Sequence, residues 1–236
     1  MPTGPWIMTQ TWHDLLFAHW PVEPPLLAAL IPPSLELDLF DGRAWLGIVP
    51  FHMTNVAPRG VPALPWMSAF PELNVRTYVR VGAKAGVYFF SLDAGNSVAV
   101  RVARTMFHLP YHSASMQVEQ RGDGIHYVSR RNSDKAPAAE LVATYRPTGP
   151  VFHPREGSLE YFLTERYCLY TVNKKGDMFT VEIHHPAWPL QVADAEIAAN
   201  SMAESAGIQP TTASPLLHFA KRQDMVNWGR TRIAAR

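Results

Sequence analysis

Residues 72–79 place an acid, an amide, a base and a phenol at every second position of one predicted strand. In the sequence ELNVRTYV the polar residues are Glu72, Asn74, Arg76 and Tyr78. Because successive side chains of a strand point to opposite faces, these four share one face and the residues between them share the other. Such a set could hold a small organic acid, with the guanidinium on the anionic group and the carboxyl orienting or exchanging a proton.

The neighbouring strand bears on whether this polar face meets solvent or a cavity. A polar face on a half-buried strand is ordinarily solvated. The segment 86–93, however, is apolar on both faces, as in a strand that is buried on both sides. Beside it we predict that Glu72 and Arg76 are partly desolvated and line an interior pocket. An alternative is a purely structural ion pair between them that fixes the register of the strands.

Five further residues are predicted to contact a ligand. Asn74 and Tyr78 belong to the polar face, and Tyr88 and Phe90 share one face of the partner strand. His19 either lines the mouth of the pocket or bonds a backbone carbonyl. Burial would raise the pKa of a carboxyl in this pocket, whereas a nearby guanidinium would lower it, and the sequence does not decide between them.

The strands that position these residues are predicted from hairpin signals. Asp41–Gly42 is a two-residue turn signal between 35–40 and 43–53. Further hairpins are expected for 72–81 with 86–93, 113–120 with 125–131, and 166–173 with 178–185, and single strands for 138–147 and 216–229. Residues 1–33 are expected to form an N-terminal arm and a short helix. A second helix should begin after Asn96, with Val98, Val102 and Met106 on one face.

Composition supports one mainly β domain over residues 1–236. The 47% hydrophobic residues suffice for a sizeable core, and 21 scattered prolines argue against a helical bundle. Eight or more strands, mostly linked as hairpins and accompanied by short α-helices, predict an antiparallel barrel or sandwich. A closed barrel of sufficient size would enclose a cavity.

Several partner classes are disfavoured by the sequence. The net charge of +1 lacks the basic excess of nucleic-acid binders. No leader-like segment or apolar run of about 18 residues occurs, so we expect a cytoplasmic protein with no membrane partner. We expect no cofactor because no P-loop or GxGxxG motif occurs, and no metal, since Pro110 interrupts the helical spacing of His108 and His112. The oligomeric state is left open, and a homo-oligomer is compatible with the sequence.

Seven segments resemble the YqjF-like family of uncharacterised bacterial proteins, in the same order and over nearly the whole chain. They are HWPV, DGRAWLGIVPF, ELNVRTYV, GVYFFSLDA, LPYHSASM, LTERYCLYT and HHPAWPL. The resemblance implies membership of the acetoacetate decarboxylase-like superfamily, and hence a cone-shaped, mainly antiparallel barrel with an interior pocket. It implies no particular reaction.

Acetoacetate decarboxylases themselves carry a pocket glutamate and, further along the chain, a PKK segment whose first lysine forms a Schiff base. The resemblance places Glu72 at the glutamate, and Pro110–Tyr111–His112 at the PKK segment. A phenol and an imidazole then replace both lysines, and neither forms an imine. The pair Lys174–Lys175 lies in a turn sequence and is not a substitute.

Two functional hypotheses follow from these residues. In the first, Arg76 binds an organic acid or carbonyl compound, while Glu72, Tyr111 and His112 carry lyase- or isomerase-type proton transfer without an imine. In the second, the pocket is a non-catalytic binding or sensor site for a hydrophobic metabolite. Detectable turnover would distinguish the two hypotheses.

Overall fold

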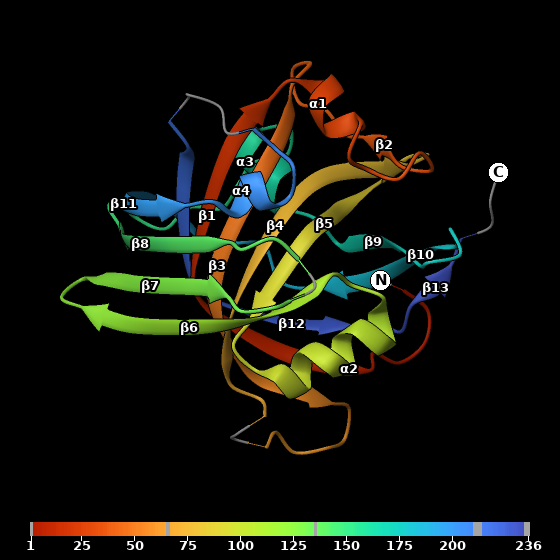
Figure 1. Ribbon diagram of the computed structural model, residues 1–236, viewed down its shortest axis with the longest axis horizontal. Coiled ribbons are helices and arrows are strands. Elements are labelled where there is room, and N and C mark those ends of the chain that lie inside the picture. The colour runs from red at the N-terminus through yellow and green to blue at the C-terminus, as the bar shows by residue number, and fades with distance from the viewer. Residues whose placement is uncertain (1, 65–66, 135, 210–213, 234–236) are drawn as a thin grey trace.

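The computed structural model describes residues 2–64, 67–134, 136–209 and 214–233. Within these residues the strands form one sheet that closes into a nine-stranded β-barrel, accompanied by four short helices (Figure 1). The predicted mainly β barrel is therefore confirmed. All but two of the strand pairings are antiparallel; β5 pairs in parallel with both β6 and β9.

Five neighbouring strands form the central part of the sheet. In spatial order they are β12 (Leu216–Asn227), β1 (Met8–Val22), β3 (Ala44–Pro58), β4 (Phe70–Val81) and β5 (Lys84–Ala94). A two-residue strand, β2 (Glu36–Leu37), extends the sheet beside β4. The turn from residue 40 to 43 has positive φ at Asp41 and Gly42, 49° and 74°, as the Asp-Gly signal predicts.

The outer strands of this central sheet, β5 and β12, are each shared between two partners. β5 pairs with β9 through residues 87–88 and with β6 through residues 92–94. β12 likewise pairs with β10 near its end and with β11 further back. Two sets of elements therefore cover opposite faces of the central strands.

The first set, here called the packed side, lies at the left of Figure 1. It consists of β6 (Tyr111–Arg121), β7 (Gly124–Arg131), β8 (Glu140–Pro147) and β11 (Leu190–Asn200), with the short helix α4 (Met202–Ser205). The second set, the pocket side, consists of β9 (Cys168–Val172), β10 (Met178–His184) and α2 (Ser97–Phe107). The remaining elements are α1 (Pro24–Ala28), α3 (Leu159–Thr164) and β13 (Thr231–Arg232).

Alternate residues of the central strands face these two sides. On β4, Leu73 and Val75 are fully buried in a continuous apolar core on the packed side. On β1, Leu16 joins the same core while Leu15 and Phe17 face the pocket side. The strands are thus buried on both faces, and the polar face of β4 meets the pocket side instead of bulk solvent.

Three elements differ from expectation. Most of the predicted N-terminal arm is β1, which pairs with both β12 and β3. Its alternation is broken near Asp14, where φ is 51° and the register with β3 shifts. Only residues 36–37 of the segment 35–40 form a strand, and β11 was not predicted.

The helix predicted after Asn96 is confirmed, with Asn96 Oδ1 accepting from two backbone N–H groups at 3.0 and 3.1 Å. The helices in the described part of the chain are all too short or too polar to span a membrane.

Candidate functional site

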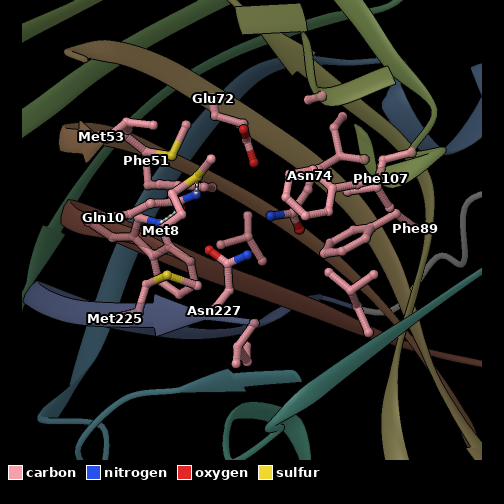
Figure 2. Close-up of a pocket in the computed structure, with 18 of the residues that line it drawn as sticks. Met8, Gln10, Phe51, Met53, Glu72, Asn74, Phe89, Phe107, Met225 and Asn227 are labelled. Carbon is pink, nitrogen blue, oxygen red and sulfur yellow. Dashed lines mark hydrogen bonds between the residues drawn. The ribbon is translucent and has the colours of Figure 1, made fainter. Parts of the chain in front are cut away.

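A cavity of about 250 Å³ lies between the central strands and the pocket side. All five central strands contribute to its walls, opposite residues from α2, β9 and β10. The walls are mostly apolar. Among the described residues that line it, the acidic and basic ones are Glu72, Arg76 and Arg166, besides His185. Figure 2 shows Glu72 and Asn74 pointing from β4 into the space that the apolar side chains surround.

Glu72 is a buried acid with one side-chain hydrogen-bond partner among the described residues. It is 4% exposed, and the Tyr111 hydroxyl donates a hydrogen bond to its Oε2 at 2.8 Å. Burial, with a smaller contribution from Asp93, raises the pKa of Glu72 to about 8, although the Tyr111 bond acts in the opposite direction. Glu72 is therefore mostly protonated at neutral pH. The structure thus brings Glu72 and Tyr111 into direct contact.

Arg76 supplies a cation to the pocket without a carboxylate partner. Its Nη2 donates to the Leu163 carbonyl at 3.2 Å, and its buried Nε has no hydrogen-bond partner in the described part of the chain. The guanidinium carbon lies 5.4 Å from the ring centre of Phe17 and 5.6 Å from that of Tyr78. No ion pair involves Arg76 among the described residues, so the structural pair with Glu72 is not formed.

Three more polar groups in the walls lack a partner. The Oδ1 atoms of Asn74 and Asn227 and the indole N–H of Trp188 are buried without a hydrogen bond to any described residue. Asn74 and Asn227 come from different strands, and Figure 2 shows them facing the same space. Buried polar groups are nearly always hydrogen-bonded, so these atoms are suited to a polar ligand or to water.

Tyr78 and His19, which were predicted to contact a ligand, do not line the cavity. The Tyr78 ring packs against the guanidinium of Arg76. Tyr78 and His19 are both fully buried, and the Tyr78 hydroxyl lies 2.6 Å from Nε2 of His19. Burial, followed by the nearby Arg76 charge, lowers the pKa of His19 well below its usual value. His19 is therefore neutral, and the pair supports the guanidinium of Arg76 through the ring of Tyr78.

Two predicted wall residues belong to the opposite face of β5. Val87 and Phe89 line the cavity, whereas Tyr88 and Phe90 pack against a separate apolar cluster. The strand pairing explains why Phe89, and not the predicted Phe90, faces the cavity. Phe89 pairs with Arg76, and a bulge shifts the register at the next residue. Paired residues of neighbouring strands share a face, so Phe89 follows Arg76 into the pocket.

His112 also lies off the cavity, because it follows Tyr111 on β6 and adjacent residues of a strand point to opposite faces. It pairs in register with Asp93, whose carboxylate forms a buried ion pair with Arg131 at 2.8 Å. Burial, Arg131 and then Arg104 lower the pKa of His112 to about 4. A role for His112 at the pocket is therefore not supported by its position.

Several wall residues were missed by sequence reasoning. Arg166 was not among the predicted pocket residues; it pairs with Asp38 at 2.5 Å and lies over the ring of Phe162. Asn227 lies on the last long strand, and nothing near it in the sequence indicates a pocket. Lys174 and Lys175 lie in the β9–β10 turn as expected, and no described lysine lines the cavity.

Comparison with known proteins gives matches over nearly the whole chain. The family DUF2071, described as an uncharacterised conserved protein, matches residues 9–224. A Bacillus subtilis (strain 168) protein named "Uncharacterized protein YqjF" is 50% identical over 228 residues, 97% of this chain and 93% of that protein.

Solved structures match over a similar length. Acetoacetate decarboxylase from Legionella pneumophila has a TM-score of 0.65 at 13% identity, covering 99% of this chain and 92% of that one. The enduracididine biosynthesis enzyme MppR, solved with pyruvate, has a TM-score of 0.64 at 10% identity with the same coverage. At these identities the two structures establish a shared fold.

Proposed function

The chain belongs to the DUF2071 family, as its resemblance to YqjF-like proteins predicted, and we propose that its pocket binds a small organic acid or carbonyl compound. One observation carries this proposal. A guanidinium without a carboxylate partner and a carboxyl that is neutral at pH 7 face the same mostly apolar cavity from one strand.

Arg76 is the group that would bind the anion. A partly buried cation without a counter-charge is unfavourable in a folded protein, and an anionic ligand removes that cost. The planar guanidinium offers two parallel N–H donors to a carboxylate, and charge-assisted bonds of this kind are the stronger ones. The unpartnered amide oxygens of Asn74 and Asn227 would accept from a hydroxyl or enol group on the same ligand.

Glu72 and Tyr111 are the groups that would exchange a proton. A carboxyl with a pKa of about 8 holds a proton at neutral pH. Because this pKa lies close to neutral pH, the group can both donate a proton to a ligand and take one back. Perturbed pKa values of this origin are common at functional sites. Without a lysine in the described walls, the chemistry is proton transfer at a carbon next to a carbonyl group, with no imine.

The relation to other proteins of the fold guides the choice of ligand. The MppR structure contains pyruvate, a keto acid, in a protein of the same fold. We therefore consider keto acids and simple carboxylates the first compounds to test. The residues that would hold them here are those of this chain, since 10% identity transfers no site.

The binding test uses isothermal titration calorimetry with pyruvate, acetoacetate and hexanoate. The variant Arg76→Met removes the charge and keeps most of the side-chain volume. Loss of charge-assisted bonds worth about 1.5–3 kcal/mol should weaken binding by roughly tenfold to a hundredfold or more. Arg80→Met is the matched control, because Arg80 is exposed on the same strand and pairs with Glu36. Equal affinity of the Arg76→Met and wild-type proteins would contradict the proposal.

The second candidate function, non-catalytic binding of a hydrophobic metabolite, is favoured by the apolar walls. Exchange of the ligand's α-protons in deuterated water, followed by NMR, separates it from the first. Catalysed exchange that Glu72→Gln abolishes supports proton transfer. Binding without exchange supports the non-catalytic function.

A further inference from the structure

The position of the cavity mouth is given by the wall residues that are also exposed. Val98 and Val102, on the first turns of α2, are 47% and 45% exposed and line the cavity. Pro58, at the end of β3, is the third exposed wall residue among those described. The cavity therefore opens between α2 and the end of β3, and this rim carries no charged side chain at these three positions.

The acidic and basic side chains of β4, Glu72 and Arg76, lie away from this mouth. Along β4, Arg76 pairs with Gly47, Glu72 with Phe51, and Phe70 with Met53 near the end of β3 that reaches the mouth. Strands rise about 3.3 Å per residue, so Arg76 is about 13 Å further along the strand than Glu72. Arg76 is therefore the inner polar group, and Glu72 lies between it and the mouth.

The outer part of the cavity is lined by flexible apolar side chains. Four of the nine methionines of the chain line it: Met8, Met53, Met67 and Met225. Figure 2 shows three of them, Met8, Met53 and Met225, together on one side of the space, with Glu72 and Asn74 on another. Methionine is unbranched and polarizable, and it adapts to apolar chains that themselves have several conformations.

We infer that the ligand is an acid with an unbranched apolar tail, whose carboxylate lies at Arg76 and whose chain extends from there toward the methionines and α2. This inference rests on the proposed binding of an anion at Arg76 and adds the class of acid. A short keto acid would leave the outer, apolar part of the cavity without contact. A chain of several methylenes would bury its surface against the apolar walls between Arg76 and the methionines.

The volume of the cavity limits the length of this tail. An apolar cavity of about 150 Å³ accommodates benzene, which corresponds to about 25 Å³ for each non-hydrogen atom. At that ratio, the observed 250 Å³ holds a ligand of about ten non-hydrogen atoms. A carboxylic acid of about eight carbons has this size, and longer chains would extend toward the mouth between α2 and the end of β3.

The test compares butanoate, hexanoate, octanoate and dodecanoate by calorimetry, below their micelle concentrations. Burial of each methylene should tighten binding about threefold to fourfold, so octanoate binds on the order of a hundredfold more tightly than butanoate. Dodecanoate should gain much less per added methylene. Equal affinity for butanoate and octanoate would contradict the inference that the ligand has an apolar tail. If Arg76→Met still weakened the binding of both acids, the proposed anion site would stand.

Two variants on one helix face and one alcohol complete the test. Val102→Asp places a carboxylate at the mouth and should weaken dodecanoate by tenfold or more relative to butanoate. Met106→Asp is the control, since Met106 is 46% exposed on the same helix and does not line the cavity. Equal effects of the two variants would contradict the exit at α2. Binding of 1-octanol as tight as that of octanoate would support the tail and contradict the anion site at Arg76.

Discussion

Replacing Glu72 with glutamine is expected to change how stability depends on pH. Glutamine has nearly the same shape as a protonated glutamate and can keep the hydrogen bond with Tyr111. At pH 5 the variant and the wild-type protein should therefore unfold at similar denaturant concentrations. Above pH 8 the wild-type protein carries a buried carboxylate and the variant does not, so the variant should be the more stable.

The direction follows from the two pKa values of Glu72. Below about 4.5, the ordinary value, the carboxyl is protonated in both the folded and the unfolded state and contributes nothing. Between 4.5 and about 8 the unfolded chain loses the proton while the folded protein retains it, so stability falls as pH rises. Above the folded-state pKa both states are ionised and the full penalty remains.

The magnitude follows from the same interval. The pKa rises from 4.5 to about 8, and at about 1.4 kcal/mol for each pH unit this amounts to about 5 kcal/mol. Buried histidines such as His19 and His218, whose pKa values are lowered by burial, act in the opposite direction. They are the same in both proteins, so the difference between variant and wild type isolates Glu72.

The assay is urea unfolding of both proteins at pH values from 5 to 9. The difference in the free energy of unfolding should grow steadily with pH and level off above pH 8. Glu119→Gln is a control, because the Glu119 side chain is 55% exposed and forms an ion pair with Arg121 at the surface. A Glu72→Gln difference that stays constant from pH 5 to 9 would refute the neutral buried acid on which the proton-transfer proposal depends.

Three further substitutions test how the site is supported. Gly86→Ala should cost about 1–3 kcal/mol of stability in urea unfolding, because its Cβ would lie 2.7 Å from Sγ and 2.8 Å from the backbone oxygen of Cys168. Arg131→Met leaves the buried Asp93 carboxylate without its counter-charge and should cost about 3–5 kcal/mol in the same assay, with partial recovery when Asp93→Asn is added. Asn96→Ala removes the cap of α2 and should lower stability by about 1 kcal/mol by thermal unfolding.

Each of these substitutions has a counterpart that should do little. Gly149→Ala places its Cβ at an ordinary contact distance of 3.7 Å from Val192. Arg130→Met breaks an ion pair with Glu140 in which the arginine side chain is 63% exposed, and such pairs contribute about 0–1 kcal/mol. Equal losses for Arg130→Met and Arg131→Met, or for Gly149→Ala and Gly86→Ala, would contradict the contacts described here.

Sequence reasoning was most successful on β4 because that strand alternates without interruption through the site. The period of two placed Glu72, Asn74 and Arg76 on one face, and all three line the cavity. The same reasoning failed on β5, where a bulge shifts the register, so that Phe89 lines the cavity in place of the predicted Phe90. A bulge inserts one residue without a distinctive sequence, so the face beyond it cannot be read from alternation alone.

The other misses have comparable physical causes. β1 is buried on both faces and contains the irregular residue Asp14, so it shows neither alternation nor a simple apolar run. Arg166 was not predicted as a wall residue, and its partner Asp38 is 128 residues away. Contacts of this range depend on how the sheet closes, and local patterns do not contain that information.

Because β5 and β12 each pair with two sets of strands, the two faces of the central strands have different structural roles. One side of the central strands forms a solid core, and the other carries the walls of the cavity. Substitutions at residues 73 and 75 of β4 therefore act on the core, whereas substitutions at residues 72, 74 and 76 act on the cavity walls. Such an arrangement lets the cavity walls change without disturbing the core, which is a physical route to a common fold at 10% to 13% identity.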